Sequence, residues 1–184
     1  MKKIFCFIIT FCLIFTFSGC KKEDNNKINS VDIEYYAKLG QIAECEYALG
    51  DNLNDIEENF KQKSIEDEDF YYDIIEGKNN RLITDGIYNY YCKMDDENQS
   101  VAYIISYDTA YGFKIGDISI EIKEALSDYD VKEEKISEDN AFFYFGDTTD
   151  SSVLICEFGD NTVMFVIQNN ALCATAIYSN ILWK

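Results

Sequence analysis

The chain has 184 residues and a formal net charge of −18 at pH 7, from 34 acidic and 16 basic groups, and it contains no histidine. The missing histidine excludes Ser-His and Cys-His nucleophilic arrangements and histidine-ligated metal sites. A single arginine, Arg81, amid many carboxylates argues against a nucleic-acid partner, because phosphate binding needs clustered basic groups.

Residues 1–19 predict a bacterial lipoprotein signal peptide. A basic start precedes an apolar run, residues 4–17, which is shorter than the roughly 20 residues that a membrane-crossing helix needs. Small residues then lead to Cys20, the predicted lipid-attachment residue, and residues 20–30 form a polar tether. We expect a lipid-anchored protein at the outer face of the cell membrane. Ordinary secretion with cleavage elsewhere is the alternative.

Three helices are predicted from the spacing of apolar residues. The first begins at Ser30 and ends before Gly40. The other two each follow a Gly-Asp turn, where the aspartate or the next residue is placed to cap the helix. The apolar positions of the three predicted helices are Val31, Tyr35, Ala37 and Leu39, then Leu53, Ile56 and Phe60, then Ile118, Ile122, Ala125 and Leu126.

The segment 47–60 resembles the segment 113–126. Both read as the end of a strand, a Gly-Asp turn and an amphipathic helix, and each is followed by an acidic linker and then by strands. We therefore predict an internal duplication, with repeat 1 at residues 31–112 and repeat 2 at residues 113–184. Coincidence among common residues is the alternative reading of this match.

Runs rich in aromatic and β-branched residues predict the strands. Short turns separate consecutive runs, which favours antiparallel pairing and hence the α+β fold class, with each repeat a helix plus an antiparallel sheet. An apolar content of 47% predicts a packed core. The predicted strands are 69–75, 86–93 and 99–107 in repeat 1, and 141–145, 152–158, 162–168 and 173–178 in repeat 2.

Four cysteines remain after the predicted signal. An even number outside the cytoplasm allows two disulfides in three pairings, whereas buried free thiols fit the apolar surroundings of each cysteine equally well. A zinc site is disfavoured because no two of them are closely spaced. These residues are Cys45, Cys92, Cys156 and Cys173.

The stretch from Lys38 to Asp51 resembles the opening of the YjgB-like domain of unknown function, a family of exported Gram-positive proteins. Similarity extends through residues 85–106 and 153–160. The resemblance implies an exported protein, and the family supplies no catalytic residue to transfer. The duplicated helix-plus-sheet pattern is also similar to the β-lactamase-inhibitor-protein fold and to small outer-membrane assembly lipoproteins, which implies a surface that binds another protein.

No common catalytic or cofactor motif is present. Neither G-x-x-x-x-G-K nor G-x-G-x-x-G occurs, and Ser-x-x-Lys occurs only at the predicted lipidation signal. We expect no cofactor. Paired carboxylates leave open a glycosidase-like hydrolase of the cell envelope. The acidic turns 95–98 and 147–151 also have oxygen ligands that suit weak calcium binding, although solvated turns explain them as well.

Aromatic residues in the predicted strands suggest either core packing or a binding face on the sheet. The run Phe142, Phe143, Tyr144 and Phe145 must place aromatic rings on both faces of its strand, so one face is either buried or offered to a partner. We predict a non-catalytic module that binds a protein or ligand at the cell envelope, with a carboxylate-dependent hydrolase as the alternative. The other aromatic residues considered are Tyr88, Tyr90, Tyr91, Tyr103 and Tyr107.

Overall fold

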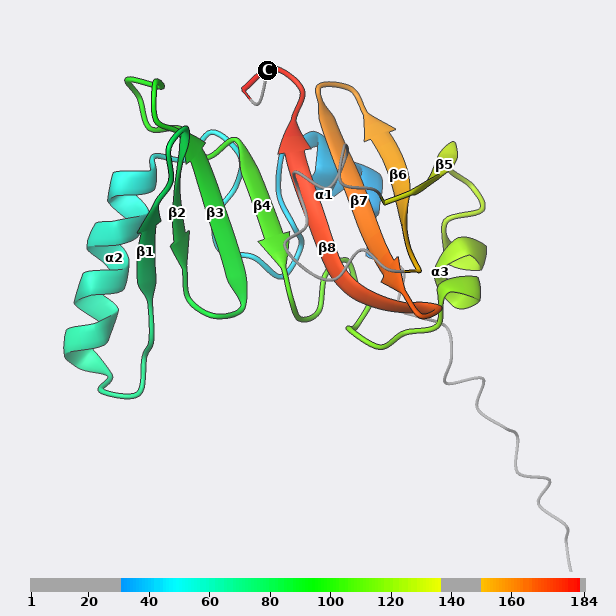
Figure 1. Cartoon of the computed structure of the whole chain (residues 1–184), viewed down its shortest axis with the longest axis horizontal. Helices are drawn as coiled ribbons and strands as arrows, with labels where there is room; N and C mark the ends of the chain where they lie inside the picture. Colours follow the sequence, from blue (N-terminus) through cyan, green and yellow to red (C-terminus); the bar gives the residue numbers. More distant parts are fainter. Residues whose placement is uncertain (1–30, 137–149, 183–184) are drawn as a thin grey trace, which may run out of the picture.

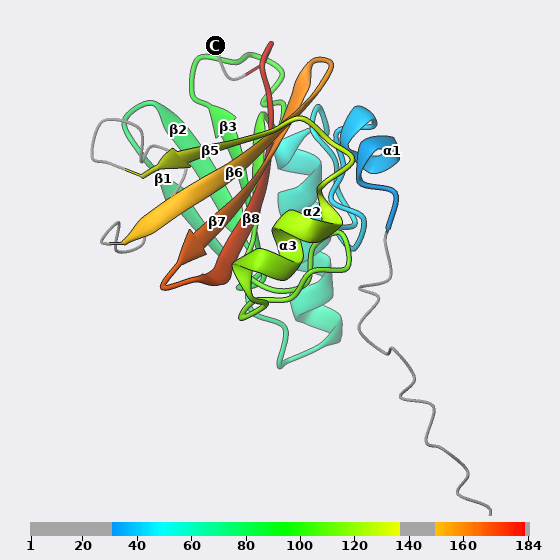
Figure 2. The ribbon, with the colours of Figure 1, turned by 90° about the vertical axis from the view of Figure 1, so that its right-hand side faces the viewer.

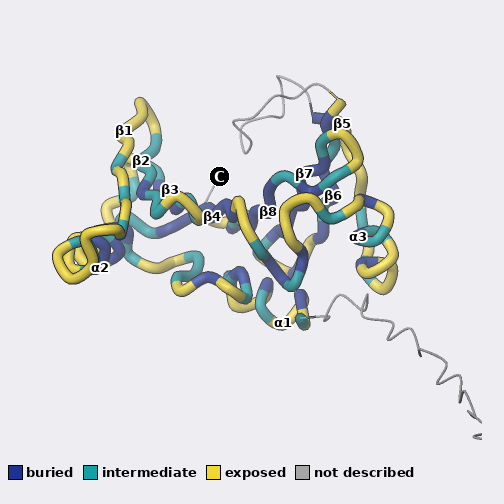
Figure 3. The backbone as a smooth tube through the Cα atoms, turned by 90° about the horizontal axis from the view of Figure 1, so that it is seen from below, coloured by how far each residue is buried: buried dark blue, intermediate teal, exposed yellow. Residues whose placement is uncertain are grey.

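The computed structural model describes residues 31–136 and 150–182, which form an α+β fold. In these two ranges, eight strands form an antiparallel sheet and the helices all lie on one face of it (Figures 1 and 2). Seen along the strands, the sheet curves so that its helix-free face is concave (Figure 3). The predicted α+β class is therefore confirmed.

The helices and strands follow one another in two comparable series. Among the described residues, each series is a helix followed by four strands, and a short helix precedes the first series. The elements are α1 (Ile33–Lys38), α2 (Leu53–Glu66), β1 (Asp73–Glu76), β2 (Asn80–Thr84), β3 (Tyr88–Lys93), β4 (Tyr103–Ser106), α3 (Ser119–Ala125), β5 (Val131–Lys135), β6 (Ser151–Phe158), β7 (Asn161–Gln168) and β8 (Ala171–Ser179).

The two series of strands join edge to edge in one sheet. The strand order is β1-β2-β3-β4-β8-β7-β6-β5, so each series is a meander and the last strands of the two series are neighbours. Strands β4 and β8 pair antiparallel, with Tyr103 opposite Tyr178 and Ile104 opposite Ile177. Strands β1 and β5 form the two edges of the sheet in the part of the chain that the structure describes.

Helix α2 confirms its predicted core face. Leu53, Ile56 and Phe60 are all buried, as their spacing on one face of a helix requires. Asn52 caps the helix by accepting a hydrogen bond from the backbone N–H of Asn54 at 2.8 Å. Asp51 instead accepts from the backbone N–H of Ala48 at 2.8 Å, and thus closes the turn before the helix.

The predicted core faces of the other two helices were partly wrong. Helix α1 begins after Asp32, which caps it, and buries Ile33 and Ala37, whereas Tyr35 and Leu39 are exposed. Ala37 is therefore buried as predicted, together with Ile33 four residues before it, whereas Tyr35 and Leu39 lie on a neighbouring face of the same helix.

In α3, Ile122 and Leu126 are buried as predicted, but Ile118 and Ala125 are exposed. Ile118 precedes the helix and forms an isolated β-bridge with Ala171. Its backbone is therefore held as an extended segment, and its side chain does not belong to the helix face that packs on the sheet.

Strand bounds differ from the predictions in two ways. Strands β2 and β5 were not predicted, because β2 has polar ends and β5 is mostly charged. The strand predicted at 69–75 is reduced to β1, which begins at Asp73. The strand predicted at 141–145 lies outside the described residues.

The two Gly-Asp turns make the same set of backbone contacts. Asp117 accepts from the backbone N–H of Lys114 at 2.7 Å, just as Asp51 accepts from Ala48. The N–H of Gly50 donates to the carbonyl of Val101, and that of Gly116 to the carbonyl of Leu172, each at 2.8 Å. Both glycines have positive φ, at 90° and 97°, which favours glycine over other residues.

Apolar side chains fill both faces of the sheet. The helix-covered face packs around Phe60, Tyr90 and Phe165, with edge-to-face contact between Phe60 and Tyr90. The helix-free face holds a second cluster that includes Tyr91, Tyr103, Ile105, Met164 and Val166. Within residues 31–136 and 150–182, none of the helices is long and apolar enough to cross a membrane.

Candidate apolar binding site

A cavity of about 390 Å³ opens on the helix-free face at the β1–β3 end of the sheet. Because side chains alternate along a strand, β1, β2 and β3 each send every second residue to this face. The cavity lies beside the edge strand β1 and reaches the residue that follows β4. Its lining residues are Ile75, Gly77, Asn80, Leu82, Asn89, Tyr91 and Tyr107.

The cavity lies at the end of a row of four residues, one on each of the strands β1 to β4, that lie directly opposite one another. Ile75 pairs with Leu82, and Leu82 with Tyr91. Tyr91 in turn pairs with Tyr103, and their ring centroids are 5.3 Å apart. The exposed fraction is 1% at Tyr103 and 2% at Tyr91, but 51% at Ile75. The row is therefore buried at Tyr103 and Tyr91 and becomes exposed to solvent at Ile75, on the edge strand of the sheet.

Among the described residues that line the cavity, the polar groups are few and uncharged. The side-chain amide of Asn89 donates a hydrogen bond to the hydroxyl of Tyr91 at 3.3 Å. Burial raises the pKa of Tyr91 and of Tyr107 above the ordinary tyrosine value, so both hydroxyls stay protonated near neutral pH. This arrangement suits an apolar or aromatic group that makes one or two hydrogen bonds, and it offers no charge to an ionic ligand.

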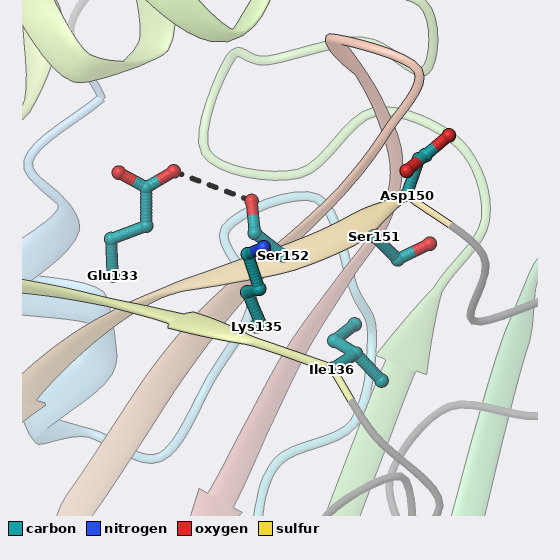
Figure 4. Close-up of a pocket in the computed structure, with 6 residues that line it drawn as sticks. All are labelled: Glu133, Lys135, Ile136, Asp150, Ser151 and Ser152. Atoms are coloured by element: carbon teal, nitrogen blue, oxygen red, sulfur yellow. Dashed lines mark hydrogen bonds between the residues drawn. The ribbon is translucent and has the colours of Figure 1, made fainter.

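A larger pocket of about 580 Å³ lies at the other end of the sheet, near β5 and β6. Figure 4 shows Glu133 and Asp150 at opposite ends of this pocket, with Lys135 between them. The carboxylate of Glu133 accepts hydrogen bonds from Lys123 at 2.9 Å and from the hydroxyl of Ser152 at 3.3 Å. Glu133 thus belongs to an ion-pair network that joins α3 to the sheet.

The acidic turn 95–98 is a structural element. The carboxylate of Asp96 accepts hydrogen bonds from the backbone N–H groups of Asn98 at 3.0 Å and Ser100 at 2.6 Å. These bonds hold the pKa of Asp96 below its usual value. No group of three or more Cys, Asp or Glu side chains in the two described ranges is arranged to hold a metal ion.

The four cysteines of the fold are free thiols. Cys45, Cys92 and Cys156 are buried, and Cys173 is partly exposed. Burial raises the pKa of Cys45 and of Cys156 to about 11, which keeps both in the unreactive thiol form. The sequence allowed either two disulfides or four buried free thiols, and in the structure all four cysteines are free thiols.

Two of the predicted site regions cannot be placed. Cys20 and the run Phe142–Phe145 lie outside the described residues. Among the other aromatic residues considered, Tyr91 and Tyr107 line the apolar cavity, whereas Tyr90 belongs to the helix-covered core. Sequence reasoning missed Ile75 and Leu82, because their place beside Tyr91 depends on strand pairing.

The fold and the site define an α+β protein with an open apolar cavity on the helix-free face of its sheet. No protein-family profile matches the chain, and no curated protein matches it. The chain is similar to a solved structure of a DUF4309 family protein (YjgB) from Bacillus subtilis subsp. subtilis str. 168. The identity is 11%, the match covers 83% of this chain and 95% of that chain, and the TM-score is 0.46.

Proposed function

We propose that this protein is a lipid-anchored, extracytoplasmic module that binds another molecule without catalysis. The observation that carries the proposal is the apolar cavity beside β1, where Ile75 and Tyr107 remain exposed next to buried Tyr91. An exposed apolar site with a few neutral polar groups marks a binding surface, since leaving it in water is unfavourable.

A carboxylate-dependent envelope hydrolase is the second candidate. It needs two carboxylates that face one substrate position across a cleft. Glu133 and Asp150 line the pocket near β5, which is why this alternative is retained, but Glu133 is already paired with Lys123 and Ser152. We therefore rank the binding role first.

The proposed location rests on residues 1–20. We propose that Cys20 carries a lipid and that residues 20–30 tether the fold to the outer face of the membrane, by analogy with bacterial lipoproteins. Substitution Cys20→Ala should then release the protein from membranes or leave it unprocessed. Identical membrane fractionation and processing of Cys20→Ala and wild type would contradict the lipid anchor.

We further propose that the fold is a tandem duplication, divided at residues 112 and 113, of the kind found in the β-lactamase-inhibitor-protein fold and in YjgB-like proteins. The equivalent contacts of Asp51 and Asp117 support this division, as do the two helix-plus-meander series. The resemblance of residues 38–51 to the YjgB-like domain supports the same relationship.

The binding role can be tested with two matched substitutions, each introducing one charge at an exposed isoleucine. Ile75 lies at the rim of the cavity and is 51% exposed, whereas Ile120 lies on α3 and is 55% exposed. After crosslinking in the native cells, wild type and Ile120→Glu should capture the same partner, and Ile75→Glu should lose it. Equal capture by both variants, at unchanged melting temperature, would contradict a binding site at the cavity.

A further inference from the structure

Strand β1 is an edge strand with exposed side chains and an open outer side. Asp73, Ile75 and Glu76 are all exposed, and β2 is the only strand paired with β1 among the residues described. Edge strands of this kind offer unpaired backbone groups to another extended chain unless charge or cover blocks them. Strand β5, the opposite edge, carries four consecutive charged residues, Lys132, Glu133, Glu134 and Lys135, and charges on an edge strand block such pairing.

The register fixes which backbone groups of β1 point outward. The N–H of Gly77 donates to the carbonyl of Asn80 at 2.8 Å, and hydrogen-bonded pairs alternate along an antiparallel ladder. Ile75 therefore exchanges hydrogen bonds with β2, and the N–H and C=O groups of Ile74 and Glu76 point away from the sheet. Within the described ranges, the outward N–H of Ile74 donates to the neighbouring side chain of Asp73, at 2.8 Å.

The outer side of β1 is where the apolar row across the sheet stops. From Tyr103 through Tyr91 and Leu82 to Ile75, each residue lies opposite the next on the same face. A strand added outside β1 would place an apolar side chain beside Ile75 and extend this row by one position. That side chain would also cover the rim of the cavity.

The chain that leads into β1 and the strand itself are acidic; Lys78 follows the strand, and the Nε of Arg81 lies 3.9 Å from the carboxylate of Glu76. Residues 66–76 contain six carboxylates and no basic residue, and all six are exposed. A partner strand with lysine or arginine residues is therefore attracted, and a second copy of this chain is repelled, because its own β1 would bring the same charges. The six carboxylates belong to Glu66, Asp67, Glu68, Asp69, Asp73 and Glu76.

We propose that β1 accepts an extended basic segment of a partner protein as an additional antiparallel or parallel strand. The backbone of Ile74 and Glu76 supplies the hydrogen bonds, and an apolar side chain of the segment packs beside Ile75 at the cavity. This inference rests on the proposed binding function and names the class of partner for that site. Strand addition of this kind obtains affinity from the backbone and specificity from alternate side chains.

The test uses a fluorescein-labelled peptide of eight residues in which lysine and isoleucine alternate, and fluorescence anisotropy with the purified chain. We expect saturable binding that weakens as salt rises. Two further peptides carry N-methyl groups on the odd-numbered or on the even-numbered residues, so that each lacks the N–H groups on one side of the strand. The peptide that lacks the N–H groups facing β1 should bind at least tenfold more weakly than the unmethylated peptide. A peptide with glutamate in place of lysine should not bind.

Two substitutions at Glu76 distinguish the contribution of its backbone N–H to peptide affinity from the contribution of its negative charge. Glu76→Ala removes one carboxylate and keeps the outward N–H, and we expect at most about a threefold loss of affinity. Glu76→Pro also removes the N–H, which edge strands tolerate, and we expect a loss of tenfold or more. Equal affinity of the two variants, or unchanged binding of both N-methylated peptides, would overturn strand addition.

The failure of this inference is distinguishable from failure of the binding function. A cellular partner that is lost in Ile75→Glu but still captured by Glu76→Pro would leave the binding function in place and overturn strand addition. A partner that is retained in Ile75→Glu would contradict the binding function itself. The N-methylated peptides keep the test decisive even if Glu76→Pro does not fold.

Discussion

Glu44 and Tyr111, which are 67 residues apart in the sequence, are joined by a carboxylate that holds a turn. One oxygen of Glu44 accepts from the backbone N–H of Tyr111 at 2.7 Å, and the other accepts from that of Gly112 at 2.8 Å. Tyr111 has a φ of 55°, which is uncommon for a residue other than glycine. The carboxylate thus fixes the connection through which β4 leads into the second half.

Replacement of Glu44 should destabilise the fold. Glu44→Ala leaves two backbone N–H groups without their acceptor. Hydrogen bonds to charged groups contribute about 1.5–3 kcal/mol each, and because Glu44 is exposed, water can take over part of its role, so we expect a net loss of roughly 1–2 kcal/mol. Thermal unfolding provides the measurement. The matched control is Glu46→Ala, because Glu46 only pairs with Lys63 on the surface at 2.7 Å. An equal loss in both variants would contradict the role of Glu44.

The two Gly-Asp turns should respond alike to the same substitution. A Cβ at Gly50 or at Gly116 would meet no atom within 4 Å, so alanine costs only the strain of positive φ, about 1–2 kcal/mol. We expect similar losses for Gly50→Ala and Gly116→Ala, and an additive loss for the double variant. Denaturant unfolding measures these values. A cost at one turn and none at the other would argue against equivalent halves.

Glu57 should stabilise the fold in a pH-dependent way. Its carboxylate contacts Lys61 on the same helix and Arg81 on β2, and these two cations hold its pKa below the ordinary value of 4.5, with Lys61 the larger influence. The stabilisation is therefore complete above about pH 4.5 and is lost as the pH falls through the lower pKa of the folded state.

Glu57→Gln tests this coupling directly. The substitution should cost on the order of 1–2 kcal/mol at pH 7, and the difference from wild type should shrink as the pH is lowered below 4.5. Unfolding curves at pH 7, 5 and 3.5 measure it. A difference that stays constant over this range would show that the charge of Glu57 contributes nothing.

Free thiols predict a specific labelling pattern. In the native state at pH 8, alkylation should be slow at Cys45 and Cys156, whose pKa values are raised to about 11 by burial, and fastest at the partly exposed Cys173. Unfolding in urea without a reductant should make all four thiols of the fold reactive. Mass spectrometry that finds two unlabelled pairs after unfolding would instead demonstrate disulfides.

Helix α2 and the central strands were predictable because their signals are local. The spacing of Leu53, Ile56 and Phe60, after a residue able to cap, is sufficient to place a helix and its buried face. Strands β6 and β7 are long apolar runs on either side of a Gly-Asp-Asn turn, and their bounds agree with the prediction within a residue.

Strand β5 and the cavity were not predictable for the same physical reason. The sequence of β5 is mostly charged, and it is a strand because β6 supplies its hydrogen-bond partners. Ile75 and Leu82 likewise line the cavity because the register of β1, β2 and β3 brings them beside Tyr91 from separate segments of the chain. Strand register cannot be read directly from a single sequence, so the residues of the cavity could be identified only from the structure.

Site-specific photocrosslinking in cells tests the central claim most directly. A photoreactive phenylalanine analogue placed at Tyr107, an exposed residue of the cavity, should yield a defined crosslinked product, and Ile75→Glu in the same chain should abolish it. The same analogue at Tyr35, exposed on α1, should yield no such product. No product from position 107, or an identical product from both positions, would contradict a binding site on the helix-free face.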